Sequence, residues 1–445
     1  MVVGGPGTGR TTTIAGIVTA ASRAWGPDRL QVQVIGDGSA SLAALADIPH
    51  VGSVVDGEDL PVTSRFLDRL AEDIAERRRL LRASGHPTLD SWWSAHEAEP
   101  TADTPPPHLL LALDGWSRIT QPRGGADLGE TADILETLLR DGTAAGLRAL
   151  VAGGREMFSG RISSLMGTRL VLHLPDRGDA ALAGLTQAQT ATRAVPGRAR
   201  RQPGGELLQI ALPGPPGDAT RPGPRPWVVE PLPETTAVLD LPPPDPGALP
   251  VGIGGEGRAP VAWRTSGARR ALVCGPPRSG RTTTLVTMAR QAHAAGHPLA
   301  VIGDDLADHA ELADCPRVDP EDRDGLIALR RLHPDLAVVA DDLDRLEEAP
   351  VADVLREILR RLDVDRGLVM AATSTQRAAT AVRGLVAEVA RGRTGVLLQP
   401  TSRSDGDALG LRVPPLPRLP GRGYLITDGR AAEMQVARCD AAGGG

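Results

Sequence analysis

The sequence predicts an α/β fold made of two tandem modules, each a mostly parallel β-sheet flanked by helices. The glycine-rich segment GGPGTGRTTT at residues 4–13 has a second copy, GPPRSGRTTT, at residues 275–284. Each copy is followed by a helix-like stretch and then by an apolar segment that ends in aspartate, at Asp114 and Asp341. Helices that alternate with strands are typical of parallel sheets, and landmarks in the same order twice indicate an internal repeat.

The repeat continues beyond the two aspartates. In both copies another apolar strand follows, then a Pro-Gly-Arg turn, at 196–198 and at 420–422, and then a closing strand. The expected strands lie at 109–114, 147–152 and 207–212 in the first copy, and at 271–274, 336–341, 367–372 and 424–427 in the second.

The first copy is longer than the second between the glycine-rich segment and the aspartate strand. Part of the extra length, residues 63–85, has apolar residues at helical spacing, which predicts a helix with one face packed in the core. We expect the run Arg77-Arg78-Arg79 to lie on its solvated surface. The apolar residues of this face are Phe66, Leu67, Leu70, Ile74 and Leu81.

We expect a first module over residues 1–212, a connector over 213–250 and a second, shortened module over 251–445. The connector is rich in proline and glycine, which disfavour both helices and interior strands. Almost no strand precedes the first glycine-rich segment. We therefore expect the first module to be truncated and upstream domains to be missing.

Composition narrows the class of protein. Of 445 residues, 41% are hydrophobic and 23% are charged, which is typical of a globular chain. The net charge of −6 and the pI near 5.9 argue against a surface that grips nucleic acid. Three widely spaced cysteines fit neither a disulfide framework nor a zinc site, and no apolar run reaches the roughly 18 residues that span a bilayer. We therefore expect a cytoplasmic chain.

The repeated glycine-rich segments fit the spacing of a phosphate-binding loop, G-x-x-x-x-G-K-[ST]. Such a loop turns several backbone N–H groups and a helix N-terminus toward a phosphate chain, and glycines let the backbone approach closely. A single copy could be an ordinary glycine turn, but two copies in register with aspartate strands favour nucleotide binding. The residues expected to bind the nucleotide are Gly4, Gly5, Gly7, Gly9, Arg10, Thr11 and Thr12 in the first copy, and Gly275, Ser279, Gly280, Arg281, Thr282 and Thr283 in the second.

Both loops carry arginine, Arg10 and Arg281, in the place of the usual lysine. The chain contains no lysine at all, so its 49 basic residues are all arginine, and the exchange fits a compositional bias of the genome. Arginine keeps the charge but is planar and bulkier than a compact ammonium. We expect nucleotide binding to survive this exchange better than hydrolysis does.

The motif pattern also predicts a magnesium site in each copy. The hydroxyl of Thr11 or Thr282 is placed to bind Mg²⁺, and Asp114 or Asp341 lies where a carboxylate would hold the water shell of the ion. An aspartate at a strand end is also a common turn former, so each carries weight only through its register with the loop.

Hydrolysis requires a group that orients the attacking water, and the two copies differ there. The second copy has Asp342 after the strand aspartate, whereas the first has Gly115. The second also has Thr373 at the end of its next strand, where the first has 153–154, Gly-Gly. We expect Asp342 to be catalytic and Thr373 to be a sensor of the γ-phosphate, although Thr373 also fits a half-buried strand residue.

These motifs resemble a known family. The segments at 2–9, 113–116, 167–170 and 249–253 are similar to the second and third ATPase modules of EccC, the FtsK/SpoIIIE-type motor of type VII secretion. The segment DIAERRRLL at 73–81 resembles a helix that FtsK-like modules carry between their Walker motifs. The resemblance covers nearly the whole chain. It departs from the family pattern at both loop arginines and in the short second module.

The resemblance implies a RecA-like fold, ATP and Mg²⁺ as ligands, and assembly with other ATPase modules or subunits of the same motor. It also implies secreted helical proteins as substrates, and attachment to the inner face of the membrane through a missing N-terminal part or a partner. Two rival functions stay open. One is a DNA translocase of the same family, disfavoured by the acidic charge, and the other is a scaffold whose nucleotide sites lock a conformation without turnover.

Overall fold

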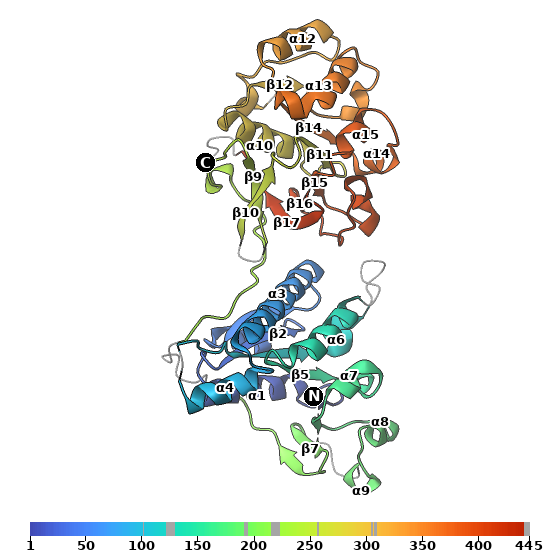
Figure 1. The fold of residues 1–445 in the computed structure, drawn as a ribbon. Helices are drawn as coiled ribbons and strands as arrows, with labels where there is room; N and C mark the ends of the chain where they lie inside the picture. The colour runs from blue at the N-terminus through green and yellow to red at the C-terminus, as the bar shows by residue number, and fades with distance from the viewer. Residues whose placement is uncertain are drawn as a thin grey trace, which may run out of the picture. The chain divides into compact units, whose positions relative to one another are not determined.

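The computed structural model describes residues 1–100, 102–121, 130–190, 195–214, 223–255, 258–303, 306 and 309–439. By their internal contacts, the residues form two compact units, which we call unit 1 (1–230) and unit 2 (231–445) (Figure 1). Each unit contains one of the two glycine-rich loops.

Unit 1 is built from strands that alternate with helices. Its strands are β1 (Val2–Val3), β2 (Leu30–Gly36), β3 (Val51–Asp56), β4 (His108–Asp114), β5 (Leu147–Gly153), β6 (Arg169–Val171), β7 (Arg198–Gln202) and β8 (Leu207–Gln209). Its α-helices are α1 (Arg10–Ala24), α2 (Ala40–Ala43), α3 (Leu60–Ser84), α4 (Leu89–Ala98), α5 (Trp116–Thr120), α6 (Glu130–Gly142), α7 (Gly160–Leu165), α8 (Arg177–Leu182) and α9 (Gln187–Thr190).

The strands of unit 1 form one sheet in the order β3-β2-β4-β5-β1-β6-β7-β8. Neighbours are parallel from β3 through β6, and β7 and β8 are added antiparallel. The closing strand β8 ends at Gln209, three residues before the predicted end. After β8 the chain runs beside the Pro-Gly-Arg turn, and Ile210 N donates a hydrogen bond to Gly197 O of that turn at 2.8 Å.

Both faces of this sheet are covered, as a parallel sheet requires. In β4, Leu109, Leu111 and Leu113 pack into one core with helices α3, α4 and α6, while Ala112 packs into the opposite core with α1. The strand is therefore apolar on both faces, which explains its uninterrupted run of hydrophobic residues.

Helix α3 confirms the predicted helical face, because all five of its expected core residues are buried. The expectation that Arg77 is solvated is wrong. Arg77 is buried, forms an ion pair of 3.1 Å with Asp73 one turn earlier, and donates a hydrogen bond to Pro107 O. Its neighbours Arg78 and Arg79 are exposed. A buried guanidinium needs such partners, and only the fold brings Pro107 to it.

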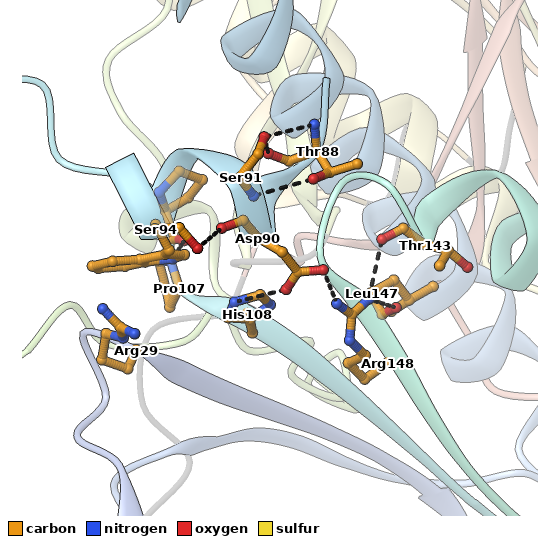
Figure 2. Close-up of polar contacts among 12 residues, drawn as sticks. Arg29, Thr88, Asp90, Ser91, Ser94, Pro107, His108, Thr143, Leu147 and Arg148 are labelled. Atoms are coloured by element: carbon orange, nitrogen blue, oxygen red, sulfur yellow. Dashed lines mark hydrogen bonds and ion pairs between the residues drawn. The ribbon is translucent and has the colours of Figure 1, made fainter. Parts of the chain in front are cut away.

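Helix α4 is docked on the starts of strands β4 and β5 by charged side chains (Figure 2). Asp90 of α4 accepts a hydrogen bond of 2.5 Å from Arg148 Nη2 and lies 3.7 Å from His108 Nε2. Burial lowers the pKa of His108, and the carboxylate of Asp90 opposes that shift. Arg29 lies over the ring of Trp93, at 3.8 Å from its centroid.

Unit 2 repeats the same alternation of strands and helices. Its strands are β9 (Ala248–Gly254), β10 (Ala259–Arg264), β11 (Arg270–Cys274), β12 (Leu299–Ile302), β13 (Ala337–Ala340), β14 (Leu368–Thr373), β15 (Gly395–Leu398), β16 (Arg422–Thr427) and β17 (Arg430–Val436). Its longer helices are α10 (Arg281–Ala294), α12 (Arg323–Leu332), α13 (Val351–Asp365), α14 (Thr375–Thr380) and α15 (Leu385–Ala390).

The sheet of unit 2 confirms the internal repeat at the level of topology. Its order is β10-β9-β17-β16-β15-β11-β14-β13-β12, in which β11 to β15 are parallel and the remaining neighbours antiparallel. Read from β12, the order β12-β13-β14-β11-β15-β16-β17 matches β2-β4-β5-β1-β6-β7-β8 of unit 1. The α/β fold with mostly parallel sheets and flanking helices is therefore as predicted.

The core of unit 2 is again double. Val338 and Ala340 of β13 pack with helices α12, α13 and α15, while Ala337 and Val339 pack with helix α10 on the other face. A parallel strand that is buried on both faces has a continuous apolar sequence, which explains the apolar run at 336–341.

The described parts of the segment between β8 and β9 are anchored within each unit. In unit 1, the ring of Trp227 packs against Phe66 with centroids 5.2 Å apart, and Trp227 O accepts a hydrogen bond from Gln33. In unit 2, Leu232 O and Pro233 O accept hydrogen bonds from Arg422 at the start of β16, and Ala237 pairs with Arg438, which follows β17. Residues 215–222 of the expected connector lie outside the described part of the chain.

Candidate nucleotide-binding sites

Each glycine-rich loop ends at the first residue of a helix. Gly9 precedes α1 with φ 102°, and Gly280 precedes α10 with φ 99°, a conformation that favours glycine. The helices begin at Arg10 and Arg281. The free N–H groups of the first helical turn are therefore turned toward the loop, as an anion-binding site requires.

The first glycine of each loop leaves space for a hydroxyl of the same loop. A Cβ on Gly4 would lie 2.5 Å from Thr8 Oγ1, and a Cβ on Gly275 would lie 2.3 Å from Ser279 Oγ. In unit 1 the conformation also favours glycine at Gly7, with φ 71°. Gly4 and Gly275 therefore accept no Cβ without rearrangement of the loop, whereas the position of Gly7 is taken in the second loop by Arg278, with φ 64°.

One loop hydroxyl is left available for a ligand. Thr8 Oγ1 donates to Gly5 O at 2.8 Å, so the hydroxyl of the first loop is satisfied internally. In the part of the chain that the structure describes, Ser279 Oγ is buried without a hydrogen-bond partner. A buried polar atom of this kind is costly unless a ligand or water satisfies it.

The threonine and the strand aspartate meet in both units. Thr11 Oγ1 donates to Asp114 Oδ2 at 2.5 Å, and Thr282 Oγ1 donates to Asp341 Oδ2 at 2.7 Å. A hydroxyl and a carboxylate side by side at the start of a helix are oxygen ligands of the kind that Mg²⁺ prefers. The same pair recurs although the sequence separation differs, 103 positions in unit 1 and 59 in unit 2.

The surroundings of Asp114 disfavour the ionised form of its carboxyl group. Burial raises its pKa, and the nearby carboxylate of Asp37 adds to that shift, while the hydrogen bond from Thr11 opposes it. Asp37 follows strand β2 and was not predicted as part of the site. A bound cation would stabilise the ionised carboxylate of Asp114 and so offset the effects of burial and of Asp37.

The arginine of the second loop is paired with the expected catalytic residue. Arg281 Nη2 lies 3.4 Å from Asp342 Oδ1, and Arg345 Nη1 lies 3.5 Å from Asp342 Oδ2. Asp342 has φ 43° and directly follows Asp341, whose Oδ1 accepts its backbone N–H. In unit 1, Gly115 occupies the matching position and offers no carboxylate to Arg10.

Thr373 lies at the end of β14, fully buried beside the aspartate strand β13. Its hydroxyl donates to Asp344 Oδ1 at 2.8 Å. Asp344 was missed at the sequence level, although the run Asp341-Asp342-Leu-Asp344 is a visible cluster of acids. In unit 1 the matching strand β5 ends at Gly153. The N–H of the next residue, Gly154, donates to Glu156 Oε1 at 2.7 Å.

The Pro-Gly-Arg turns form part of the loop environment in both units. Gly197 N donates to Thr8 O at 3.0 Å, and Gly421 N donates to Ser279 O at 2.8 Å. Each turn is held by a glutamine side chain that was not predicted, because Gln209 donates to Pro196 O and Gln435 donates to Pro420 O. A glutamine recurs in the second strand after each turn, in β8 and in β17, and this repetition is the signal that could have identified them.

One pocket adjoins the second loop, and another adjoins the two aspartates that follow strand β13. One of about 560 Å³ is lined by the start of α10, the Pro-Gly-Arg turn and residues 234–235, and Thr283 also lines it. Another of about 400 Å³ contains Asp341 and Asp342. In unit 1, Thr12 follows Thr11 in the first turn of α1.

Cys274, which precedes the second loop, is fully buried. Burial raises the pKa of its thiol to about 12, which makes it an inert core residue.

Comparison with known families identifies the first loop and its strand. The FtsK/SpoIIIE family model matches residues 1–157, which include Thr11 and Asp114. The predicted resemblance to this family is therefore confirmed.

The chain is similar to two ESX secretion system proteins. The ESX-4 secretion system protein EccC4 of Mycobacterium tuberculosis is 26% identical to 98% of this chain, and the ESX-1 secretion system protein EccCb1 of the same organism is 22% identical to 67% of it. The chain spans only 38% of the length of EccC4 and 54% of that of EccCb1.

Solved structures agree on the fold. ATPases 2 and 3 of Thermomonospora curvata EccC, solved in complex with a signal sequence peptide, align with 99% of this chain and 88% of their own at a TM-score of 0.69 and 20% identity. ATPases 2 and 3 of Geobacillus thermodenitrificans EssC align with 99% of this chain and 91% of their own at a TM-score of 0.65 and 18% identity. Among the helices that the structure describes, none is both long and apolar enough to cross a bilayer.

Proposed function

We propose that this chain is an ATP-binding component of a type VII secretion-like protein export motor. Its two FtsK/SpoIIIE-type modules, 1–212 and 251–445, are joined by the connector 213–250. The observation that carries the proposal is the hydrogen bond between a loop threonine and a strand aspartate, made twice. It is supported by the family match over 1–157 and by the similarity to EccC4 along nearly the whole chain.

In each module the glycine-rich loop would bind the phosphates of ATP through backbone N–H groups and its arginine. The residues fit this role because each loop begins with a glycine that admits no Cβ and because Ser279 Oγ is buried without an internal partner among the described residues. Thr11 with Asp114, and Thr282 with Asp341, would hold Mg²⁺. The ion would supply charge neutralisation for the phosphates.

Turnover, where it occurs, belongs to the second module. Asp342 would orient and deprotonate the attacking water once Arg281 turns from it to the phosphates, and Thr373 would act as a sensor through Asp344. The Asp342 carboxylate is already paired with two arginines, Arg281 and Arg345, which compete with a water molecule for it. This pairing favours a second candidate function, a scaffold that binds ATP and turns it over slowly or not at all.

The partners of the motor follow from its relatives. We propose other ATPase modules or subunits of the same motor as assembly partners, and secreted helical proteins as substrates, because ATPases 2 and 3 of T. curvata EccC have been solved with a signal sequence peptide. The proposed place of action is the cytoplasm, at the inner face of the membrane through a further segment or a partner.

Titration with a fluorescent ATP analogue in the presence of Mg²⁺ tests the proposal. We expect two sites, of which Thr11→Ala removes one and Thr282→Ala the other. Thr13→Ser, which keeps the hydroxyl that donates to Gly9 O, is a matched control expected to leave both sites intact. Absence of binding at millimolar nucleotide would refute the function.

A further inference from the structure

The pocket beside the second loop has one wall that does not belong to the loop. On one side lie Gly280 and Thr282, at the start of helix α10. The lining of the pocket also includes Glu234 and Thr235, which lie near the start of unit 2, before strand β9. The pocket volume of about 560 Å³ is larger than a phosphate chain needs.

Residues 232–235, which we call the wall segment, are held at their start by the buried side chain of Arg422. Arg422, the last residue of the Pro-Gly-Arg turn, donates to Leu232 O at 3.2 Å and to Pro233 O at 2.9 Å. The Arg422 side chain is only 9% exposed and lies 3.4 Å from the carboxylate of Glu433, so its own charge is neutralised. A guanidinium buried in this way fixes the backbone that it binds.

The other end of the wall segment is fixed by strand-like pairing. Arg438 N donates to Thr236 O at 2.7 Å, and Val238 N donates to Arg438 O at 2.9 Å. Glu234 and Thr235 therefore lie between two anchored stretches, and their exposed side chains are presented to the pocket by a backbone that is already ordered.

The chemistry of the pocket fits the part of a nucleotide that the loop does not bind. Once the loop takes the phosphates, the sugar and base must continue into adjacent space. The lining of that space includes apolar residues, Leu419, Pro420 and Val436, and polar ones, which are the carboxylate of Glu234, the hydroxyl of Thr235 and the guanidinium groups of Arg278 and Arg438. Apolar side chains pack against the faces of a base, while a carboxylate accepts hydrogen bonds from amino or hydroxyl groups.

We infer that Glu234 and Thr235 form the wall that contacts the sugar and base of the nucleotide at the second site, and that Arg422 is its positioning residue. The inference rests on the proposed function and adds a source of binding energy that the phosphate-binding motifs do not contain. Unit 1 offers the matched comparison. Arg198, in the same place of its turn, donates to Gln209 Oε1 at 3.0 Å and is exposed.

The test compares two probes in a Thr11→Ala background, so that binding is measured at the second site. ATP contains phosphates, sugar and base, whereas inorganic tripolyphosphate contains phosphates alone. We expect the double variant Glu234→Ala/Thr235→Ala, and separately Arg422→Gln, to weaken Mg²⁺-dependent ATP binding about 5- to 30-fold and to leave tripolyphosphate binding unchanged. Arg198→Gln is the control, expected to change neither.

The outcomes separate the inference from the function beneath it. If the variants bind ATP as tightly as the parent, or lose ATP and tripolyphosphate equally, the wall does not contact the sugar and base. If the parent binds neither probe, the proposed function falls and the inference with it. Because Glu234 and Thr235 are exposed, their substitution keeps the test valid even where Arg422→Gln disturbs folding.

Discussion

Arg281 Nη2 lies 3.4 Å from Asp342 Oδ1, so the residue that replaces the loop lysine is paired with the expected catalytic carboxylate. A bound triphosphate would compete with Asp342 for this guanidinium. The forked side chain can reach both groups, whereas a compact ammonium acts as a point charge. The identity of this one residue therefore affects both phosphate binding and the freedom of Asp342 to contact the attacking water.

We expect Arg281→Lys to raise the single-turnover rate of ATP hydrolysis at the second site about tenfold, with a smaller effect on ATP affinity. The physical reason is that lysine frees Asp342 while still reaching the phosphates. The matched control is Arg10→Lys, which faces Gly115 and has no carboxylate to release. An equal rise in both variants would show that the Arg281–Asp342 pair is irrelevant to turnover.

The raised pKa of Asp114 predicts a pH dependence at the first site. Because burial and Asp37 raise this pKa, the carboxyl group takes up a proton at a higher pH than an ordinary aspartate. We expect Mg²⁺-dependent nucleotide binding at the first site to weaken as the pH falls, and to do so at a higher pH than for an ordinary aspartate, measured in the Thr282→Ala background. Asp37→Asn should move this loss to lower pH, and an unchanged profile would contradict the assignment.

The raised pKa of Asp114 also predicts how the stability of unit 1 without ligand depends on pH. This dependence has the opposite sign to that of nucleotide binding. A folded-state pKa above the unfolded value means that the stabilising contribution is present at low pH and is lost as the pH rises through the folded pKa. At neutral pH the ionised Asp114 therefore destabilises the ligand-free unit. We expect Asp114→Asn to raise the melting temperature without ligand but to weaken Mg²⁺-dependent ATP binding on the order of 10–100-fold.

His108 predicts acid sensitivity of unit 1. Burial lowers its pKa, so the unfolded chain binds a proton more readily than the folded one, and stability falls as the pH drops through and below about 6.5. We expect His108→Gln to flatten this dependence by up to one proton. Tryptophan fluorescence during thermal unfolding reports on unit 1, which contains Trp25, Trp92, Trp93, Trp116 and Trp227, whereas unit 2 contains Trp263.

The control for this measurement lies in the same cluster. Asp90→Asn removes the carboxylate that opposes the shift, so it should steepen the acid dependence at His108. If both variants behave as the parent does, the acid sensitivity has another source.

Much of the fold could be predicted because the repeat gives the same information twice. The apolar runs before Asp114 and Asp341 identified buried parallel strands, and the observed strand order is the same in both units. The meeting of Thr11 with Asp114 was predictable from register alone, since the strand that carries the aspartate ends near the loop. Local patterns were sufficient where the interaction partner is itself a motif.

The rest depends on contacts between residues far apart in sequence. Arg77 is buried because Asp73 and Pro107 O neutralise and bind it, and no pattern around residues 77–79 shows the second of these. The proline-rich composition of 213–250 indicates an extended chain but not that Arg422, about 190 positions later, fixes Leu232 and Pro233. Such partners become visible only in the folded structure.

The acidic balance of the chain predicts weak binding of duplex DNA. A net charge of −6 leaves few phosphate contacts, and genuine DNA binding falls steeply with salt because counterions are released. We expect no binding below micromolar concentration at physiological salt in a fluorescence anisotropy titration. Sub-micromolar affinity that collapses at higher salt would favour a DNA translocase instead.

We expect the first module to hydrolyse ATP far more slowly than the second. Asp114 can hold Mg²⁺, but Gly115 offers no carboxylate to orient water, and the strand that ends at Gly153 offers no side-chain hydroxyl where the second module has Thr373. Losing a positioned base typically costs on the order of 10²–10⁴ in rate. Single-turnover measurements in the Thr11→Ala and Thr282→Ala backgrounds isolate the two rates.

Two reciprocal variants decide whether the carboxylate causes this difference. Asp342→Asn should lower the rate of the second site by about 10²–10⁴, while Gly115→Asp should raise that of the first. The gain is sterically reasonable, because Gly115 has φ 89° and Asp342 itself has a positive φ of 43°, a region that aspartate tolerates better than most residues. A Cβ on Gly115 would come no closer than 3.7 Å to Arg118 Cβ. If Asp342→Asn leaves the rate unchanged while Asp114→Asn abolishes it, the active module is the first, and the roles assigned to the two sites are reversed.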